Sequence, residues 1–394
     1  MPIPKLLAHR FTVAIVTAIA AGITFYVYVV DASLRALIDF DVYRQAAKAF
    51  ANGENIYQRA YTVLDRWGRP IQLSYYYPPL LAHVLSWLTG FSDATVKCGW
   101  CLLNFALMAV TAISLSAIIK DSWWGSFSSA SRTLIIGFFV VCFEPLYVGH
   151  GDGQVTALVL ATLSLATLSG LKRRDTLEGI LLALAICIKI SPALILLAPI
   201  VFRRWRVVGS CAATCTALAL VTVVFSGQGA QPFIDFARSL TATVDDALVH
   251  SHVFNFVMSK TLLSPLGLSD VAVARWTIKL ILLGLAVLGT VAIREQSGMT
   301  YLRAYGFLIT CMILASPIIW FHHLAWMLIP LAVLSTRTAS STDQRMKHLT
   351  LSLGLYFALS QTYLCNIWAR KLAPSLSPLA TLAPALLLVV IGVV

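Results

Sequence analysis

The chain has 394 residues, of which 59% are hydrophobic and only 12% are charged, whereas an ordinary soluble domain has roughly 45–50% apolar and about 25% charged residues. This composition excludes a soluble globular protein and predicts a chain embedded in a lipid bilayer, with no room for a large soluble domain between its apolar runs. The formal charge of +12 does not predict a nucleic-acid partner here, because the basic residues gather at the ends of apolar runs, as the positive-inside bias of membrane proteins requires.

The first apolar run, at about residues 11–30, follows Lys5, His9 and Arg10. It is too long for a signal peptide and has no small-residue cleavage site. We therefore expect a retained membrane anchor with its amino end in the cytoplasm.

The polar stretch at about residues 31–75 is then expected on the outer side of the membrane. Val42, Ala46 and Phe50 recur every four residues in it, with polar residues between them, and Gly53 is placed to end a helix. This pattern predicts an amphipathic helix that lies on the membrane surface.

The remaining apolar runs predict an all-α, polytopic membrane protein of about 11–13 membrane segments, in which residues 1–394 form a single transmembrane domain. These runs lie at about 79–91, 98–119, 133–148, 155–171, 177–201, 207–225, 271–293, 304–320, 324–336, 349–364 and 377–394. Basic clusters between them mark cytoplasmic turns, which places a second outer loop at about residues 226–270. The chain has no internal repeat, which weakens the case for a transporter built from two related halves.

The run from Leu177 to Val201 has basic clusters at both ends, so a single crossing would put one cluster on the wrong side. A broken hairpin of two half-helices, each about 12 residues or about 18 Å long, resolves the conflict. Pro192 supplies a reason for the break. Irregular backbone at membrane depth is tolerated where it lines a wet cavity, and Lys189 would point into that cavity.

Two carboxylates, Asp39 and Asp41, open the amphipathic helix. Acidic residues at a helix amino end are favoured by the helix dipole, so capping is one interpretation. A second is a general base at the membrane boundary, which takes a proton from a hydroxyl group that approaches from outside. A metal-binding Asp-x-Asp pair is a third.

Polar groups also stand beside apolar runs at three other places. Tyr77 precedes two prolines that start a helix, and interfacial tyrosines are ordinary membrane-belt residues. Gln154 ends a glycine-rich turn at 149–154, which is either a connector or part of a site. Glu144 belongs to the same place as this turn and lies inside an apolar run. A carboxylate is costly there unless it has a partner, so Glu144 is a functional candidate.

The third place is the break at Ser316 and Pro317, which precedes Trp320, His322 and His323. Two adjacent histidines after a break favour a functional site over simple packing. At most one of them need face a cavity, because adjacent side chains on a helix point in different directions, and a metal pair at this spacing is not expected. We expect no metal and no cofactor.

Taken together, these residues resemble the multi-pass GT-C glycosyltransferases, and specifically glycosyltransferase family 87, which includes mycobacterial alpha-mannosyltransferases that use polyprenyl-phosphate-mannose. The elements that carry the resemblance over most of the chain are Asp39-Phe40 with Val42-Tyr43, Tyr77-Pro78-Pro79, Gly153-Gln154-Val155, Lys189 with Pro192, Arg203-Arg204-Trp205, and Ser316-Pro317 with Trp320, His322 and His323. The family often has Asn after the Gly-Gln-Val element, whereas this chain has Thr156.

The resemblance implies transfer of a hexose, with mannose the first choice, from a polyprenyl-phosphate-linked donor to a hydroxyl group of a lipid or glycan acceptor. The active site would lie at the extracytoplasmic face of the cell membrane, and direct displacement would invert the anomeric centre. Asp39 matches the position of the family's base, and Asp41 ranks second. The leaving phosphate needs cationic or hydrogen-bonding stabilisation. The candidates for it are Lys189, His322 and His323, with Arg44 and Arg370 behind them, and the other candidate substrate-binding residues are Tyr77, Glu144, Gln154 and Trp320.

Two other classes of protein stay open. A transporter or flippase of a lipid-linked sugar would also need polar residues at membrane depth. The other class is a structural subunit that supports another transferase. Charged residues gathered at the outer boundary favour an enzyme, whereas midplane charges in paired broken helices would favour transport.

Overall fold

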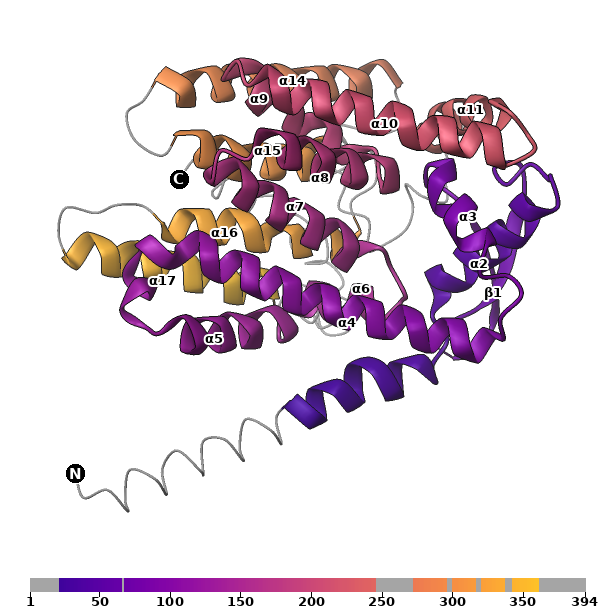
Figure 1. The fold of residues 1–394 in the computed structure, drawn as a ribbon, viewed down its shortest axis with the longest axis horizontal. Helices are drawn as coiled ribbons and strands as arrows, with labels where there is room; N and C mark the ends of the chain where they lie inside the picture. The colour runs from indigo at the N-terminus through magenta and orange to yellow at the C-terminus, as the bar shows by residue number, and fades with distance from the viewer. Residues whose placement is uncertain are drawn as a thin grey trace.

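The structure is a computed structural model that describes residues 21–65, 67–245, 272–295, 300–316, 320–336 and 342–360. Within these ranges most helices run in roughly the same direction (Figure 1). A small region that covers one end of the bundle, here called the outer region, consists of residues 38–86 and 231–245. Three helices are long and apolar enough to cross a membrane alone, namely α4 (Asp93–Ile118), α10 (Trp205–Phe225) and α14 (Ala272–Glu295). The predominantly helical membrane fold predicted from the apolar runs is therefore confirmed.

The run predicted at 133–148 is not one straight helix. It is divided between α5 (Ser129–Val141) and α6 (Glu144–Gly151), which are bent by 61° relative to each other. Pro145 stands in the first turn of α6, where its ring is tolerated because that backbone nitrogen needs no intrahelical partner. No sequence pattern predicted this break, because apolar composition alone does not reveal one.

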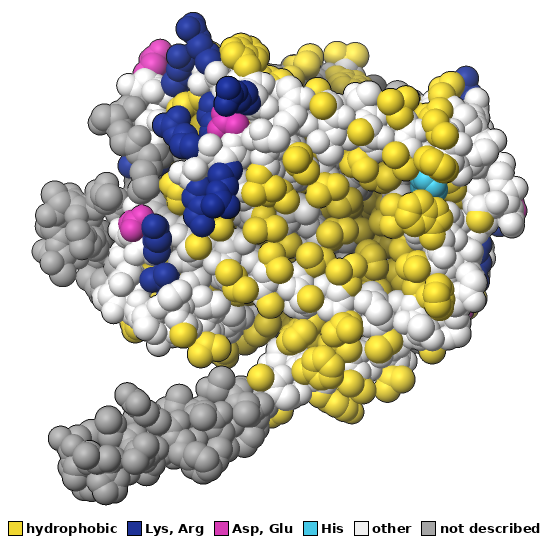
Figure 2. Space-filling model, viewed as in Figure 1, with side chains coloured by type: hydrophobic (Ala, Val, Ile, Leu, Met, Phe, Trp, Pro, Cys, Tyr) yellow, Lys and Arg dark blue, Asp and Glu magenta, His cyan; other side chains and the backbone are white. Residues whose placement is uncertain are grey.

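Six further helices complete the bundle within the described ranges. They are α7 (Thr156–Leu171), α8 (Asp175–Ile188), α9 (Leu197–Val201), α15 (Thr300–Ala315), α16 (Leu328–Ser335) and α17 (Thr342–Ser360). Most side chains of α7 are buried, in keeping with its central position between α4 and α8. By contrast, α10 and α14 expose large apolar side chains such as Phe225 (72% exposed) and Leu280 (64% exposed). Hydrophobic side chains spread over the face of the molecule in Figure 2, as expected for a surface covered by lipid.

The predicted broken hairpin is present. The first half is α8, and the returning half is the 3-10 helix η4 (Ser191–Leu196) followed directly by α9. Lys189 ends α8 with extended backbone, and Pro192 stands in the first turn of η4. The basic clusters at 172–174 and 203–206 contribute to the same cavity, so the chain returns to the end from which it started.

The outer region begins with α2 (Ile38–Ala51), and Gly53 follows it with a φ of +76°, as predicted for a helix end. An unpredicted antiparallel hairpin comes next, in which β1 (Ala60–Leu64) pairs with β2 (Pro70–Ser74) so that Ala60 faces Ser74. The side chain of Gln45 donates to the carbonyl of Thr62 at 2.8 Å and holds this hairpin on α2.

The outer region also includes α3 (Pro79–Ser86) and α11 (Gln231–Asp245). The Gln228 side chain donates to the Phe50 carbonyl at 2.8 Å, so the two predicted outer loops meet. Several predictions lie outside the described residues: the start of the first run at 11–20, the rest of the second outer loop at 246–270, Pro317, Arg370 and the run at 377–394.

Candidate active site

The amino end of α2 lies against the glycine-rich turn. The backbone N–H of Asp39 donates to the carbonyl of Asp152 at 2.8 Å. Gly153 has a φ of +75°, and a Cβ at this position would lie 2.6 Å from the Cβ of Phe40. Only glycine lets the turn approach α2 this closely. The turn therefore packs on the amino end of α2 and brings Gln154 close to Asp39, although the two residues are more than 100 positions apart in the sequence.

Two tyrosine hydroxyl groups converge on Gln154. Tyr43 donates to the side-chain oxygen of Gln154 at 3.0 Å, and Tyr77 donates to the same atom at 2.7 Å. Burial raises the pKa of both tyrosines, and the negative charge of Asp39 raises both pKa values further. The hydroxyl groups therefore stay protonated at neutral pH, as their hydrogen bonds to Gln154 require.

Lys189 reaches this cluster from the tip of the broken hairpin. Its ammonium group contacts Nε2 of His323 and lies 5.4 Å from the ring centres of both Tyr77 and Trp326. Aromatic faces and an imidazole surround the charge of Lys189. Because this side chain is only partly buried, a ligand can still reach it.

The two histidines lie in the 3-10 helix η6 (Phe321–Met327), and both are buried. Nδ1 of His323 accepts the backbone N–H of Trp320 at 3.2 Å, and its ring stacks on Trp326 at 5.0 Å. The ring of His322 stands nearly perpendicular to that of His323 at 4.6 Å.

The position of His322 is set by the glycine-rich element. A Cβ on Gly149 would lie 2.9 Å from the Cβ of His322, so η6 can approach α6 only because Gly149 has no side chain. Nε2 of His322 is buried and has no hydrogen-bond partner among the described residues. A buried nitrogen without a partner costs free energy, which makes it a candidate contact for a bound group.

Asp41 and Arg44 lie apart from this cluster, although both were candidates. Asp41 pairs with Lys97 at 2.9 Å, and Arg44 pairs with Asp93 and donates to the Phe91 carbonyl at 3.3 Å. These contacts fasten α2 to the start of α4. Both side chains are engaged in holding the outer region on the bundle.

Glu144 and Trp320 are placed differently again. Glu144 starts α6, at the other end of that helix from Gly149, and its backbone N–H donates to the Ser360 hydroxyl at 3.2 Å. Trp320 precedes η6, and its backbone N–H donates to Nδ1 of His323.

Two residues of the cluster had no assigned role in the sequence, Tyr43 and Trp326. Tyr43 could have been found, because it lies four residues after Asp39 and therefore on the same face of α2. Trp326 donates from Nε1 to the Thr156 carbonyl at 3.4 Å and forms the floor under His323 and Lys189. It lies inside an apolar run, where an aromatic residue signals only core packing.

The cluster thus combines a carboxylate, an ammonium group, two imidazoles and two hydroxyl groups from four separate parts of the chain. Such a set can take a proton at one point and stabilise a developing negative charge at another. Within the described ranges, no group of three or more His, Cys, Asp or Glu side chains is arranged to hold a metal ion.

A cavity lies elsewhere in the molecule, between the basic clusters at 172–174 and 203–206. None of the residues of the Asp39 cluster lines it.

Comparison with known proteins gives a consistent picture. Residues 75–317 match the model of glycosyltransferase family 87. A polyprenol-phosphate-mannose-dependent alpha-(1-2)-phosphatidylinositol mannoside mannosyltransferase of Mycobacterium tuberculosis is 29% identical over 196 residues, which cover 47% of this chain and 43% of that protein. The protein of the same description from Mycolicibacterium smegmatis is 25% identical over 327 residues, which cover 75% of this chain and 69% of that protein.

The chain therefore spans less than half the length of the first of these relatives in the matched region. The crystal structure of ArnT from Cupriavidus metallidurans bound to undecaprenyl phosphate aligns with 96% of this chain and 75% of its own, at 14% identity and a TM-score of 0.42. The region matched by the family model contains Tyr77, Gln154 and Lys189 but neither Asp39 nor the two histidines.

Proposed function

Because this chain belongs to glycosyltransferase family 87, we propose that it transfers a hexose from a polyprenyl-phosphate-linked donor to a hydroxyl group of a lipid or glycan acceptor. Mannose is the sugar we propose, since both mycobacterial relatives are described as polyprenol-phosphate-mannose-dependent mannosyltransferases. The observation that carries the proposal is that Lys189 and the two histidines meet beside Tyr77 and Gln154, at the glycine-rich turn to which the backbone of Asp39 is bonded.

Asp39 acts as the general base in this proposal. The acceptor hydroxyl oxygen attacks the anomeric carbon of the sugar, the bond from that carbon to the phosphate oxygen breaks, and the hydroxyl proton passes to the Asp39 carboxylate. A single displacement inverts the anomeric centre. The Tyr43 and Tyr77 hydroxyl groups both donate to Gln154, so they fix this side of the site and add no charge to it.

Lys189, His322 and His323 stabilise the leaving polyprenyl phosphate. Negative charge grows on the phosphate as the sugar leaves, and preorganised donors in a water-poor site lower the free energy of such a transition state. The partly exposed ammonium of Lys189 and the unpartnered Nε2 of His322 are the groups suited to contact that phosphate. Asp41, Arg44, Glu144 and Trp320 support the site from outside in this scheme.

We place the active site on the extracytoplasmic face of the cell membrane. The basic clusters at 172–174 and 203–206 gather at the end of the bundle remote from α2 and the β-hairpin (Figures 1 and 2). Because Lys and Arg are enriched on the cytoplasmic side of membrane proteins, this distribution supports an outward-facing Asp39.

The direct test is product formation by the purified full chain. The protein in detergent is incubated with polyprenyl-phosphate-linked mannose and an extracted lipid pool, and new glycolipids are sought by mass spectrometry. We expect a product that carries one added hexose and that depends on both the donor and Asp39. A matched incubation with polyprenyl-phosphate-linked glucose tests the choice of sugar.

A different result would contradict the proposal. If no linked sugar gave a product, but vesicles containing the protein moved a lipid-linked sugar between leaflets, the chain would be a flippase.

A further inference from the structure

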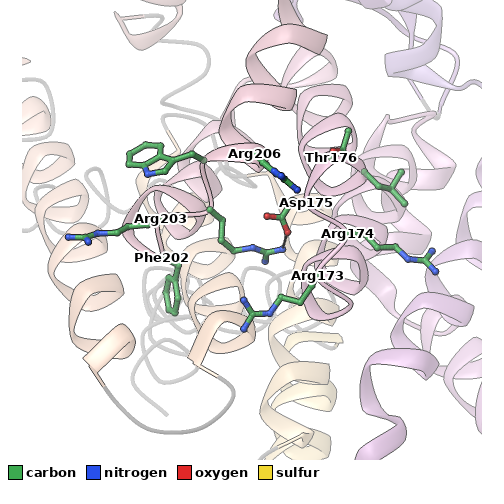
Figure 3. Close-up of a pocket in the computed structure, with 10 residues that line it drawn as sticks. Arg173, Arg174, Asp175, Thr176, Phe202, Arg203 and Arg206 are labelled. Carbon is green, nitrogen blue, oxygen red and sulfur yellow. Dashed lines mark hydrogen bonds and ion pairs between the residues drawn. The ribbon is translucent and has the colours of Figure 1, made fainter.

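A second polar site lies at the end of the bundle remote from Asp39, where the turn between α7 and α8 faces the turn between α9 and α10. Lys and Arg side chains gather at this end of the molecule (Figure 2). Between the two turns is an open cavity of about 920 Å³, and arginine side chains surround it (Figure 3). Its lining residues are Arg173, Arg174, Asp175, Thr176, Leu177, Phe202, Arg203, Arg204, Trp205 and Arg206.

The two turns are built alike. Arg173 has a φ of 57° and Arg203 a φ of 55°, and the next residue in each turn donates its backbone N–H to a carbonyl of the preceding helix, Arg174 to Ser169 at 2.9 Å and Arg204 to Pro199 at 2.8 Å. A left-handed residue after a helix is usually glycine, because a side chain is disfavoured there. Both turns carry arginine at that position instead.

One of the five arginines is already neutralised within the chain. Arg204 is buried and pairs with Asp175 and, at 3.0 Å, with Glu178. The hydroxyl groups of Tyr301 and Tyr305 both donate to Glu178. Arg204 therefore holds the two turns together, and the two carboxylates already neutralise its charge.

The other four arginines are not neutralised. Arg173, Arg174, Arg203 and Arg206 are exposed, and none of them makes a side-chain hydrogen bond or ion pair with the residues that the structure describes. Asp175 is the one acidic residue in the lining, and it belongs to Arg204. Four exposed guanidinium groups around one cavity, without an acidic partner in the described part of the chain, suit an anion with several oxygens.

The rim of the cavity shows what kind of molecule carries that anion. Trp205 is 62% exposed and Leu177 is 42% exposed, and both belong to the lining. Trp205 also begins α10, a helix long and apolar enough to span the bilayer. An exposed tryptophan at the end of a spanning helix lies at the level of the lipid headgroups.

We propose that this cavity binds the phosphate of an anionic phospholipid from the leaflet at this end of the bundle. The guanidinium groups of Arg173 and Arg203 hold the phosphate from the two turns, and Trp205 and Leu177 contact the start of the acyl chains. Basic pockets between membrane helices recognise anionic headgroups in this way. This site is separate from the proposed transfer reaction, since none of its residues belongs to the Asp39 cluster.

The test uses a double variant, Arg173→Gly with Arg203→Gly, in the purified full chain. Glycine suits the left-handed backbone better than arginine does, so the melting temperature should stay the same or rise, and any lost binding cannot come from misfolding. The matched control is Lys172→Gln with Arg294→Gln, which removes the same charge from two exposed positions that do not line the cavity.

Native mass spectrometry counts phosphatidylglycerol and phosphatidylcholine retained by each protein, with and without excess inorganic phosphate. We expect the parent to prefer phosphatidylglycerol, and the glycine double variant to bind it about 30-fold more weakly, given the usual electrostatic contribution of each arginine near a charged bilayer. The control pair should keep most of the parent's binding.

Three results would overturn the proposal. They are equal retention of the two lipids by the parent, an equal loss in both variant pairs, which would indicate diffuse surface charge, and displacement of the lipid by inorganic phosphate, which would indicate a free anion as the ligand. Because the readout is lipid binding, it is independent of whether the chain transfers a sugar.

Discussion

The two ends of the bundle both hold a basic side chain inside the protein, but they treat its charge in opposite ways. Arg204 is enclosed by Asp175 and Glu178, and two tyrosine hydroxyl groups complete the network. Lys189 forms no ion pair in the described part of the chain and instead contacts His323 and two aromatic faces. A cation neutralised by its own chain stabilises the fold, whereas one held without a close counter-ion is ready for an anion from outside.

The largest effect should come from Asp39→Asn. The amide can still cap α2 but cannot accept the acceptor's proton, so turnover should fall by about 10²–10⁴-fold with normal expression and donor binding. Initial rates of glycolipid formation give the measurement. Asp41→Asn is the matched control, because it breaks only the pair with Lys97, and it should keep measurable activity. An Asp39→Asn protein with the parent's rate would leave Asp39 as a helix cap alone.

Arg204→Met tests the other end of the comparison. It leaves Glu178 buried without its cationic partner, and breaking a buried ion pair in this way costs about 3–5 kcal/mol. Thermal unfolding in detergent should show a clear fall in the melting temperature. Arg206→Met removes an exposed arginine two residues later and should change stability by less than about 0.5 kcal/mol. Equal melting temperatures for the two variants would remove the structural role assigned to Arg204.

Lys189→Met should lower turnover and leave stability unchanged, whereas Arg204→Met should lower stability. Methionine keeps the length of the side chain and removes the charge, so the protein should fold normally. Loss of a preorganised charge-stabilising group commonly costs about 10²–10³-fold in turnover, which initial rates at saturating donor would detect. Lys97→Met is the control, since it removes a cation near α2 that lies outside the cluster. Full turnover with unchanged donor affinity in Lys189→Met would contradict the role proposed for the ammonium group.

Tyr77→Phe should have the smallest effect. The hydroxyl of Tyr43 still satisfies the Gln154 oxygen, so the loss is one hydrogen bond of about 0.5–1.5 kcal/mol, or about 2- to 10-fold in rate. Tyr75→Phe removes a hydroxyl that donates to Pro78 at 3.1 Å, away from Gln154, and should leave the rate unchanged. A complete loss of activity in Tyr77→Phe would mean that this hydroxyl contacts the substrate.

Local patterns made the central parts of this arrangement predictable. The apolar spacing of α2 and Gly53 set the bounds of that helix, and the conflict between two basic clusters, together with Pro192, predicted the hairpin that carries Lys189. In both cases the physical cause lies within about 25 residues of sequence.

Other features depend on partners far along the chain, and the sequence could not reveal them. Arg44 looked like a phosphate contact because nothing near it in sequence announces the pair with Asp93. The β-hairpin was missed because its alternation of buried Tyr61 and Val63 with exposed neighbours is short, and a search for membrane runs passes over it. Trp326 was hidden because an aromatic residue among apolar neighbours has the same pattern in a core as in a site.

The broken hairpin also sets the order in which this protein can be made. Its halves, α8 with 14 residues and η4 with α9 after it, are each too short to cross about 30 Å of hydrocarbon. Neither half can therefore stay in the bilayer alone, and each needs the neighbours it packs on, α7 and α10 for α8 and α15 for η4. Lys189 can reach its final depth only after α15, more than 100 residues later, has been synthesised. Trp326, one of the two aromatic residues beside this ammonium group, follows α15 in the chain, so the surroundings of Lys189 are completed late in synthesis.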